Sequence, residues 1–403
     1  MTTATKRILF VDDEEHVLEG LRNLFRRQRH VWDMVFVTSG EAALVELEKA
    51  PFDVIVSDMR MPGMDGATLL LHVKSRYPSV VRIVLSGHAE RAAMVRALSV
   101  AHQFLSKPCE ADTLRAALER TCALRDLLSH EPIRRAAGQL DRLPSAPGAY
   151  WELARALAQS DVAWQDVAAI IERDTAMAVK VLQLVNSPFF GLSRQVVSVQ
   201  QAVMYLGVDL LKGLTLGAHV FAALPSVQMP GFSLDEFQRH AQLTAELARH
   251  FVADPVRIDE SFTAAMIHDI GQVVLALGMP VEFADVRREV RQTGRPIDEV
   301  ETERLGVTHA AVGAYLLGLW GLPFPIVEAV AYHHQPSLVT SGPREVLAAV
   351  HVSEAFAEAA DDSRADARID LAFLEQAGLS AKLPQWRTIA ARHTSRDARV
   401  TAG

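Results

Sequence analysis

The sequence predicts an α/β doubly wound parallel sheet followed by an all-α helical bundle. Short apolar segments alternate with helical segments up to about residue 128, which is the element order of a doubly wound sheet. Acids, a hydroxyl and a lysine stand where several of these apolar segments end, and reactive groups gather at that edge of a parallel sheet. From residue 143 onward the apolar residues recur with helical spacing, and no strand-like alternation stands out.

Each element of the first part has its own signal. The expected strands are apolar runs at 7–11, 34–37, 54–57, 82–85 and 103–105. The expected helices cover 15–27, 40–50, 66–76, 90–98 and 112–128. Ser39 stands where a helix N-cap is favoured, and Pro51 follows the end of the same helix. The long apolar stripe of the last helix is compatible with a solvated connector or with a two-helix contact between protomers.

The second part is expected to be helical almost throughout. Its first group of helices is predicted at 149–158, 164–172, 176–185, 199–206 and 210–223. After a break between Pro225 and Pro230, a second group is predicted at 234–252, 261–277, 281–293, 300–305, 310–320, 325–334 and 346–359. One or two closing helices fit 371–379 and 383–390, and residues 394–403 are expected to form a frayed tail.

A chain of 403 residues is too long for one ordinary core, so two or three domains are expected. Pro144 and Pro147 interrupt the helical pattern and mark the clearest boundary. We therefore predict a first domain at 1–128, a helical connector at 129–142 and an output domain at 143–395. The output domain is expected to divide into subdomains at 143–228 and 229–395.

Composition favours a soluble cytoplasmic protein, with 49% hydrophobic and 22% charged residues. No apolar run reaches the length of a membrane span, and the polar start leads directly into a strand, which leaves no room for a signal peptide. Cys109 and Cys122, the two cysteines, fit reduced thiols. Residues 1–125 carry a net charge of +1 and residues 126–403 one of −9, so direct nucleic-acid binding is not expected.

A phosphorylation site is predicted at the carboxyl edge of the sheet. Asp12, Asp13 and Asp58 follow two of the strands, and carboxylates suit Mg²⁺, a hard cation. Lys107 can pair with Asp58 and then with a phosphoryl oxygen, and Ser86 can bond another. Asp58 is the expected nucleophile because it follows the central strand and precedes a sharp Met-Pro-Gly turn. Each residue alone could be a helix cap, a turn residue or a surface charge, but their joint order favours the site.

Residues 6–128 resemble a response-regulator receiver domain. The resemblance rests on VDDE at 11–14, SDMRMPGMDG at 57–66, LSG at 85–87 and FLSKP at 104–108. It implies a flavodoxin-like fold and phosphorylation of Asp58 by a partner histidine kinase, with Mg²⁺ held by Asp12, Asp13 and Asp58. It also implies that Ser86, Phe104 and Lys107 form the switch that senses the phosphoryl group.

Seven of the fifteen histidines lie in the second group of helices, namely His240, His250, His268, His309, His333, His334 and His351. His268 and Asp269 are expected inside one apolar helix, where burial requires either hydrogen-bonding partners or a cation. Imidazoles and carboxylates without thiolates suit Fe, Mn, Mg or Zn rather than a structural zinc finger. Each histidine taken alone is more simply a hydrogen-bonded core or surface residue.

The histidine pattern resembles the HD superfamily of metal-dependent phosphohydrolases. The resemblance implies metal ligands at His240, His268, Asp269, His309, His333 and His334, with Glu354 where the superfamily carries its last Asp. Two departures put catalysis in doubt. Gln272 stands where relatives that hydrolyse cyclic dinucleotides carry a Lys, and the Gly-Tyr-Pro segment of those relatives is missing.

Residues 140–360 are similar to the HDOD output module, which looks like an HD fold without demonstrated general catalysis and is used in signalling and protein contacts. The similar segments are LPSAP at 143–147, IIERD at 170–174, VLQLVNSPFFG at 181–191 and AVMYLG at 202–207. Within the third segment, Asn186 and Ser187 are expected to cap the following helix.

These resemblances imply a bacterial two-component response regulator, a phosphoprotein whose non-catalytic HDOD bundle acts through protein contacts. An unknown downstream protein and a homodimer are the expected partners. The alternative is a metal-dependent phosphodiesterase at residues 230–360 that acts on a cyclic dinucleotide. No helix-turn-helix pattern or basic stripe supports a transcription factor.

Overall fold

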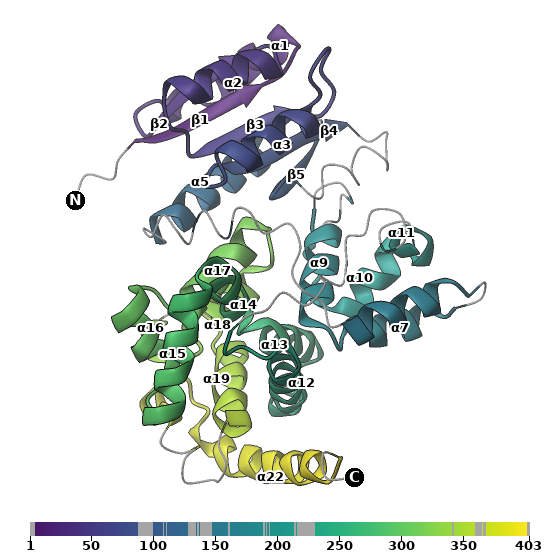
Figure 1. The fold of residues 1–403 in the computed structure, drawn as a ribbon, viewed down its shortest axis with the longest axis vertical. Helices are drawn as coiled ribbons and strands as arrows, with labels where there is room; N and C mark the ends of the chain where they lie inside the picture. Colours follow the sequence, from purple (N-terminus) through teal and green to yellow (C-terminus); the bar gives the residue numbers. More distant parts are fainter. Residues whose placement is uncertain are drawn as a thin grey trace.

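The computed structural model places a sheet domain at one end of the molecule and two groups of helices at the other (Figure 1). It describes residues 5–87, 100–107, 109, 111–127, 134, 137, 147–159, 162–187, 190, 192, 194–212, 215, 230–340, 342–358, 365 and 368–400. Among these, the part from Pro147 onward contains helices and no strand. The predicted fold class is therefore confirmed.

The sheet has five parallel strands in the order β2-β1-β3-β4-β5. The strands are β1 (Lys6–Val11), β2 (Trp32–Val37), β3 (Val54–Asp58), β4 (Val81–Gly87) and β5 (Gln103–Lys107). All five predicted strands are present, and each is longer than expected by one to three residues. Because the strand order reverses beside β1, the carboxyl ends of β1 and β3 form the crevice in which such sheets bind ligands.

The helices of the sheet domain are α1 (Glu15–Leu24), α2 (Gly40–Lys49), α3 (Gly66–Arg76) and α5 (Ala111–Leu127), with a 3₁₀ turn at Arg26–Gln28. Ser39 caps α2 by accepting a hydrogen bond from the Ala42 N–H at 3.2 Å, as predicted. Asp65 caps α3 in the same way through the Thr68 N–H at 2.8 Å. The helix expected at 90–98 lies outside the described residues, as does most of the connector at 129–142.

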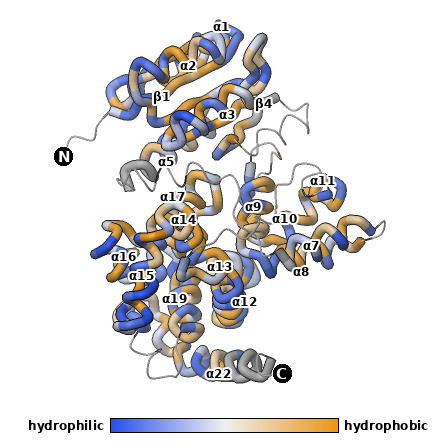
Figure 2. Tube along the Cα trace, viewed as in Figure 1, coloured by the Kyte–Doolittle hydropathy of each residue, from blue (hydrophilic) through white to orange (hydrophobic). Residues whose placement is uncertain are grey.

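The sheet is buried on both faces, which explains its unbroken apolar strands. Ile8 and Phe10 on β1 point into one half of the core, and Leu9 and Val11 point into the other. Figure 2 shows β1 and β4 mainly in hydrophobic colours, whereas the outer helices α15 (Pro280–Thr293) and α16 (Ile297–Leu305) carry more hydrophilic ones.

The first helical group is α7 (Pro147–Leu157), α8 (Trp164–Ile171), α9 (Thr175–Val185), α10 (Val199–Leu206) and α11 (Val208–Lys212). Every residue of α9 is buried, so this helix is the core of the group. The later part of the helix predicted at 210–223 lies outside the described residues, apart from Thr215.

The second helical group begins with α12 (Leu234–Phe251) and ends with α22 (Leu383–Val400). Between them lie α13 (Pro255–Ile267), α14 (Ile270–Gly278), α15, α16, α17 (His309–Leu319), α18 (Phe324–Tyr332), α19 (Glu345–Glu358) and α21 (Leu371–Gln376). Short 3₁₀ turns cover Pro336–Leu338 and Ser380–Lys382. The backbone of α22 is helical to Val400, so the prediction of a frayed tail from residue 394 is wrong for residues 394–400.

The prediction of a single helix at 261–277 is also wrong. The chain forms α13 and α14, and His268 and Asp269 lie at the break between them. Asp254 starts α13 early, because its carboxylate caps the Val256 N–H at 2.8 Å and Pro255 fits the first turn. Gly271 explains the tight packing after the break: a Cβ there would lie 1.9 Å from the carbonyl oxygen of His309.

One stretch of the described chain, Pro255–Gly278, is long and apolar enough to cross a membrane by length and composition. In the structure 89% of its most apolar 18-residue window is buried inside the bundle.

Candidate functional site

The carboxyl edge of the sheet brings two acids and a lysine together. Asp12 follows β1, Asp58 ends β3 and Lys107 ends β5. The Lys107 ammonium lies 2.6 Å from Asp12 Oδ2 and 2.7 Å from Asp58 Oδ1. A residue at the end of β5 thus joins the carboxylates of two adjacent strands, as the sequence predicted for this edge.

Both carboxylates are almost fully buried and are oriented by the backbone. Asp12 Oδ1 accepts a hydrogen bond from the Glu14 N–H at 3.1 Å, and Asp58 Oδ2 accepts one from the Arg60 N–H at 3.1 Å. Burial alone would lower the pKa of Lys107, but its hydrogen bonds to the two aspartates outweigh burial and raise that pKa. The site therefore holds a fixed positive charge against two acids.

The turn after Asp58 depends on two glycines. Gly63 has a φ of 76°, which glycine adopts without strain. A Cβ at Gly66 would lie 2.0 Å from the Asp58 carbonyl oxygen, so α3 can start this close to the acid only with glycine at that position.

The remaining predicted residues of this edge differ in their placement. Asp13 is next to Asp12 but exposed to solvent. Phe104 is buried in β5. Ser86 lies in β4, where its backbone pairs with Ser106, and its side chain is outside the described residues. The structure thus joins Asp12, Asp58 and Lys107 directly and leaves Asp13 on the rim.

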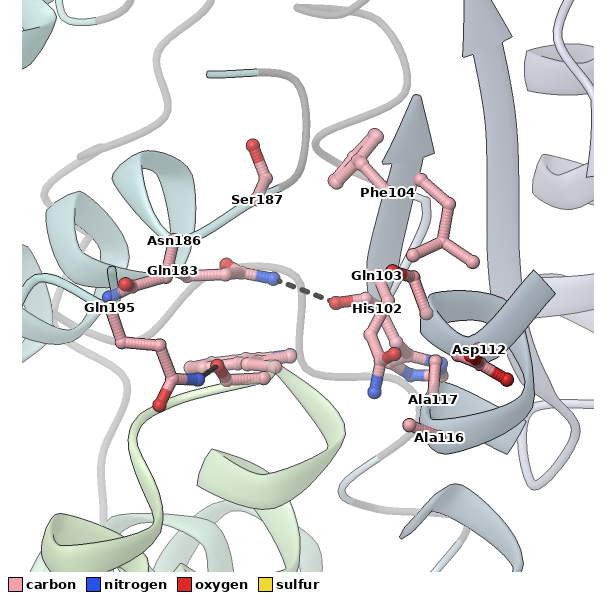
Figure 3. Close-up of a pocket in the computed structure, with 14 residues that line it drawn as sticks. His102, Gln103, Phe104, Asp112, Ala116, Ala117, Gln183, Asn186, Ser187 and Gln195 are labelled. Carbon is pink, nitrogen blue, oxygen red and sulfur yellow. Dashed lines mark hydrogen bonds between the residues drawn. The ribbon is translucent and has the colours of Figure 1, made fainter. Parts of the chain in front are cut away.

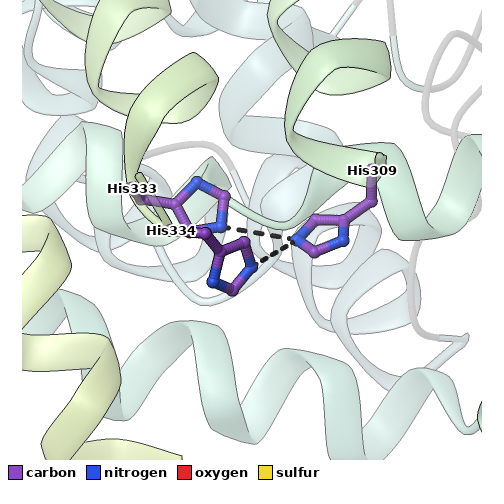
Figure 4. A group of neighbouring side chains, drawn as sticks. All are labelled: His309, His333 and His334. Carbon is purple, nitrogen blue, oxygen red and sulfur yellow. Dashed lines mark hydrogen bonds between the residues drawn. The ribbon is translucent and has the colours of Figure 1, made fainter. Parts of the chain in front are cut away.

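A second candidate site is a buried cluster in the HD-like region. His268 and Asp269 at the α13–α14 break meet His309 at the start of α17, His333 and His334 after α18, and Glu354 on α19. His309 Nε2 lies 3.4 Å from His333 Nε2 and 3.0 Å from His334 Nε2 (Figure 4). It also lies 3.0 Å from Asp269 Oδ1.

Hydrogen bonds at Nδ1 turn three of these rings toward one another. His268 Nδ1 lies 2.6 Å from the Ala265 carbonyl and His333 Nδ1 lies 2.8 Å from the Val330 carbonyl, so both nitrogens donate. His309 Nδ1 donates to Glu301 Oε2 at 2.7 Å. In a neutral ring Nε2 then carries a lone pair directed into the cluster, whereas a protonated His309 donates from Nε2 to Asp269 Oδ1. Metal-binding histidines are commonly oriented in this way.

Several polar atoms of the cluster lack a hydrogen-bond partner among the described residues. They include His240 Nε2, His268 Nε2 and Glu301 Oε1, each buried, whereas Asp269 Oδ1 has His309 Nε2 3.0 Å away. Two sets of residues could each hold a metal ion, because the donor atoms within each set lie within 4.8 Å of one another. The first set is His309, His333 and His334, and the second is His268, Asp269, His333 and Glu354. Because a cation would satisfy the orphaned His268 Nε2, the residues fit a metal ion with nitrogen and oxygen ligands.

Burial and neighbouring charges shift the pKa values of the cluster in both directions. Burial lowers the pKa of His240 to about 4 and also lowers those of His333 and His334, so these rings are neutral at pH 7. Burial raises the pKa of Asp269, but the neighbouring His268 and His309 outweigh it, so that pKa lies well below its usual range. Burial raises the pKa of Glu354 well above its usual range.

Two of the histidines that the sequence analysis singled out lie outside the two compact sets. His240 stands farther out, with its Nε2 3.8 Å from Asp269 Oδ2, and belongs to neither compact set. His351 has a structural role: its Nδ1 donates to the His333 carbonyl at 2.6 Å and its Nε2 accepts from the Asp370 N–H at 2.8 Å.

Two residues of the cluster were missed by the sequence analysis. Glu301 on α16 is fully buried and holds both the backbone N–H of His309, at 2.8 Å, and its Nδ1. Arg287 on α15 donates to Gln272 Oε1 at 3.3 Å and brings a cation near Asp269. Both lie on polar helix faces that resemble ordinary solvent-exposed faces, so the sequence carried no signal that set them apart.

The next helix in the described chain is α10, whose N-cap position is Ser198, so Asn186 and Ser187 do not cap it, contrary to prediction. Asn186 ends α9 and its amide binds the loop at Val196: Nδ2 donates to the Val196 carbonyl at 2.7 Å, and Oδ1 accepts from the Val196 N–H at 2.7 Å. Ser187 donates to the Leu184 carbonyl at 2.7 Å. Both residues fix the end of α9 instead.

Comparison with known proteins gives two family matches. The family model of the response regulator receiver domain matches residues 8–119, and that of the HDOD domain matches residues 143–336. The first match covers the aspartate site, and the second covers the helical part up to Pro336.

Individual relatives match parts of the chain. An uncharacterized protein of Treponema pallidum is 27% identical over 199 residues, which are 49% of this chain and 39% of that protein. The hydrogenase transcriptional regulatory protein HoxA of Cupriavidus necator is 33% identical over 125 residues, 30% of this chain and 25% of that protein. The chain thus spans less than two fifths of the length of either curated relative.

Among solved structures, a virulence factor from Campylobacter jejuni shares the fold with a TM-score of 0.54 and 19% identity. The match covers 65% of this chain and 97% of that one.

Proposed function

The chain carries a response regulator receiver domain followed by an HDOD domain, and from this premise we propose that it is a two-component response regulator phosphorylated at Asp58. The observation that supports this most directly is the Lys107 ammonium bound between Asp12 and Asp58, at 2.6 and 2.7 Å. That arrangement leaves a buried carboxylate next to a fixed cation, which can stabilise the charge of an arriving phosphoryl group.

In this proposal a histidine kinase is the phosphoryl donor, and Mg²⁺ is bound by Asp12, Asp13 and Asp58 at the edge of the sheet. Oxygen ligands at a solvent-accessible rim suit Mg²⁺, which keeps several waters. The cation reduces repulsion between Asp58 and the donor. Lys107 and Ser86 then bind phosphoryl oxygens, and Phe104 responds to their movement.

The output of the proposed regulator is a contact between its HDOD bundle and a downstream protein. We propose that it acts in the bacterial cytoplasm and as a homodimer, without direct nucleic-acid contact. The acidic second part of the chain, with a net charge of −9 at residues 126–403, supports the last point because it repels phosphate backbones.

Labelling by acetyl phosphate tests this function. The wild-type protein should become phosphorylated in the presence of Mg²⁺, and Asp58→Asn should not. Asp33→Asn is the matched control, because Asp33 is an exposed acid on the same sheet. Equal labelling of Asp58→Asn and the control would refute the assignment.

A second candidate function is a metal-dependent phosphodiesterase acting on a cyclic dinucleotide. The buried His268 Nε2, which has no hydrogen-bond partner among the described residues, favours it because it suits a bound cation. A metal held by His268, Asp269, His309, His333, His334 and Glu354 would supply Lewis-acid chemistry to a phosphodiester. Arg287 beside Gln272 offers a positive charge near the position of the missing Lys.

This second candidate is tested by metal analysis and a chromogenic phosphodiester such as bis(p-nitrophenyl) phosphate. Turnover that disappears in His268→Ala and Asp269→Asn would support the enzyme. A metal-loaded protein without turnover in Fe, Mn, Mg and Zn would leave the contact-based function.

A further inference from the structure

Three parts of the molecule meet around one cavity of about 410 Å³. The receiver supplies the start of β5 and one face of α5, the first helical group supplies the end of α9, and the second supplies the turn after α17 (Figure 3). His102 and Phe104 line it from the first side, Gln183 from the second and Trp320 from the third. A movement of β5 would therefore change the wall of a cavity that both helical groups also line.

Among the described residues, one long hydrogen bond connects the receiver side of this cavity to α9. Gln183 Nε2 lies 3.4 Å from the His102 carbonyl oxygen, and Gln183 is 2% exposed (Figure 3). Its Oε1 has no hydrogen-bond partner among the described residues. A buried amide with one weak bond and one orphaned oxygen is poorly satisfied. An alternative arrangement of this contact therefore costs little, which a switch between two states requires.

The opposite end of α9 reaches the elements that carry the histidine cluster. Thr175 Oγ1 donates to the Met266 carbonyl at 3.2 Å, two residues before His268. Asp174, the N-cap of α9, accepts a hydrogen bond at Oδ2 from the Gln238 amide at 2.8 Å, and Gln238 lies two residues before His240. Helix α9 has 11 residues and is therefore about 16 Å long. Because the helix is buried along its whole length, a shift of one end must be accommodated at the other end.

Helix α17 forms a second connection between the same two places. His309 is its first residue and lies in the cluster, and Trp320 follows its last residue and lines the cavity. The helix packs against α5 of the receiver. The Lys180 ammonium of α9 lies 5.5 Å from the centre of the Trp320 ring, which ties the two helices together.

We propose that α9 and α17 couple cation binding at the histidine cluster to phosphorylation at Asp58, with Gln183 and Trp320 as the positioning residues. This inference rests on the proposed function. Phe104 and Lys107 lie on the same strand, so a phosphoryl group at Asp58 acts on the wall of the cavity. The coupling is reciprocal by thermodynamic linkage: phosphorylation changes the affinity of the cluster for a cation, and the cation changes the affinity of the receiver for a phosphoryl mimic by the same factor.

Titration of the full chain with Zn²⁺ tests the coupling. The chelator-treated protein is titrated in excess Mg²⁺, with and without beryllium fluoride, a stable mimic of an acyl phosphate. In the wild type the Zn²⁺ dissociation constant should differ between the two states by about 5-fold or more. In Gln183→Ala and in Trp320→Phe the difference should fall to less than about 2-fold, although both ligands still bind. Gln159→Ala, which removes an exposed amide, should keep the full difference.

Hydrogen exchange gives a readout that requires only one of the two ligands. Beryllium fluoride alone should change exchange at residues 175–185 and 309–320, and Zn²⁺ alone should change exchange at 101–107. Both effects should weaken in Gln183→Ala. If both ligands bind the wild type with equal affinity in either state and exchange is unchanged, the coupling is overturned. Loss of labelling at Asp58 would instead count against the proposed function, and the Zn²⁺ arm would still decide the coupling.

Discussion

Glu301 and His309 form the most completely buried ion-pair contact of the histidine cluster. One carboxylate oxygen, Oε2, accepts hydrogen bonds from the backbone N–H of His309 at 2.8 Å and from its Nδ1 at 2.7 Å. The contact fixes both the start of α17 and the orientation of the ring. Burial opposes a charge on His309, but Glu301 and Asp269 outweigh burial and raise the pKa of His309 well above its usual range.

Glu301→Gln is therefore expected to weaken Zn²⁺ binding by about 10- to 100-fold, because the ring loses the carboxylate that orients it and makes it basic. The apparent dissociation constant, measured by competition with a chelator, checks this. Glu299→Gln on the same helix serves as the control, since its side chain is 57% exposed. Equal affinities in the two variants would mean that Glu301 has only a structural role.

Lys107→Met should lower the free energy of unfolding at pH 7 by roughly 1–3 kcal/mol, because two buried carboxylates lose their counter-charge and the lysine is itself partly exposed. Added Mg²⁺ should restore more stability to this variant than to the wild type, since the cation replaces the missing positive charge. Urea unfolding with and without Mg²⁺ measures both effects. A variant that Mg²⁺ stabilises no more than the wild type would contradict this account.

Asn186→Ala is expected to cost about 2–3 kcal/mol of stability, because the amide makes two short bonds to Val196 and a third to the Leu182 carbonyl at 3.0 Å. Asn23→Ala, at an exposed position of α1, should change stability by less than about 0.5 kcal/mol. Thermal or chemical unfolding of the two variants distinguishes them. A similar loss in both would show that the Asn186 contacts contribute little.

His351→Ala should destabilise the fold without changing how much metal the protein binds, because both nitrogens of His351 are used in bonds to the backbone. His268→Ala should remove bound metal and also destabilise the metal-free protein, because it loses the Nδ1 bond to the Ala265 carbonyl at 2.6 Å and leaves a cavity in the core, so metal content is the readout that separates the two variants. Elemental analysis and unfolding curves measured in chelator give the two readouts. Metal lost in His351→Ala but kept in His268→Ala would invert the assignment.

The sequence was sufficient for elements whose signal is local. The strands of the sheet were found from continuous apolar runs, and the cap at Ser39 follows from short-range chemistry. The acid, lysine and histidine positions were found because their residue types and order are distinctive. The sequence identified candidate residues for the two sites but not the distances between their side chains.

The errors share a physical cause, which is packing between distant segments. The break at His268 could not be foreseen, because the apolar pattern runs on from α13 to α14 and only the close approach of α17 separates them. Glu301 and Arg287 were missed for a similar reason: a charged residue on a helix is usually solvated, and only the fold shows that these two turn inward.

The contact between Gly271 and the carbonyl of His309 has a consequence for how the cluster could evolve. The distance between the two helices at this point is set by a hydrogen atom, because any larger group would overlap the carbonyl oxygen. A methyl group at position 271 would push α14 and α17 apart and would therefore separate the donor atoms on the two sides of the cluster. The spacing of the cluster thus depends on Gly271, although this residue contributes no donor atom.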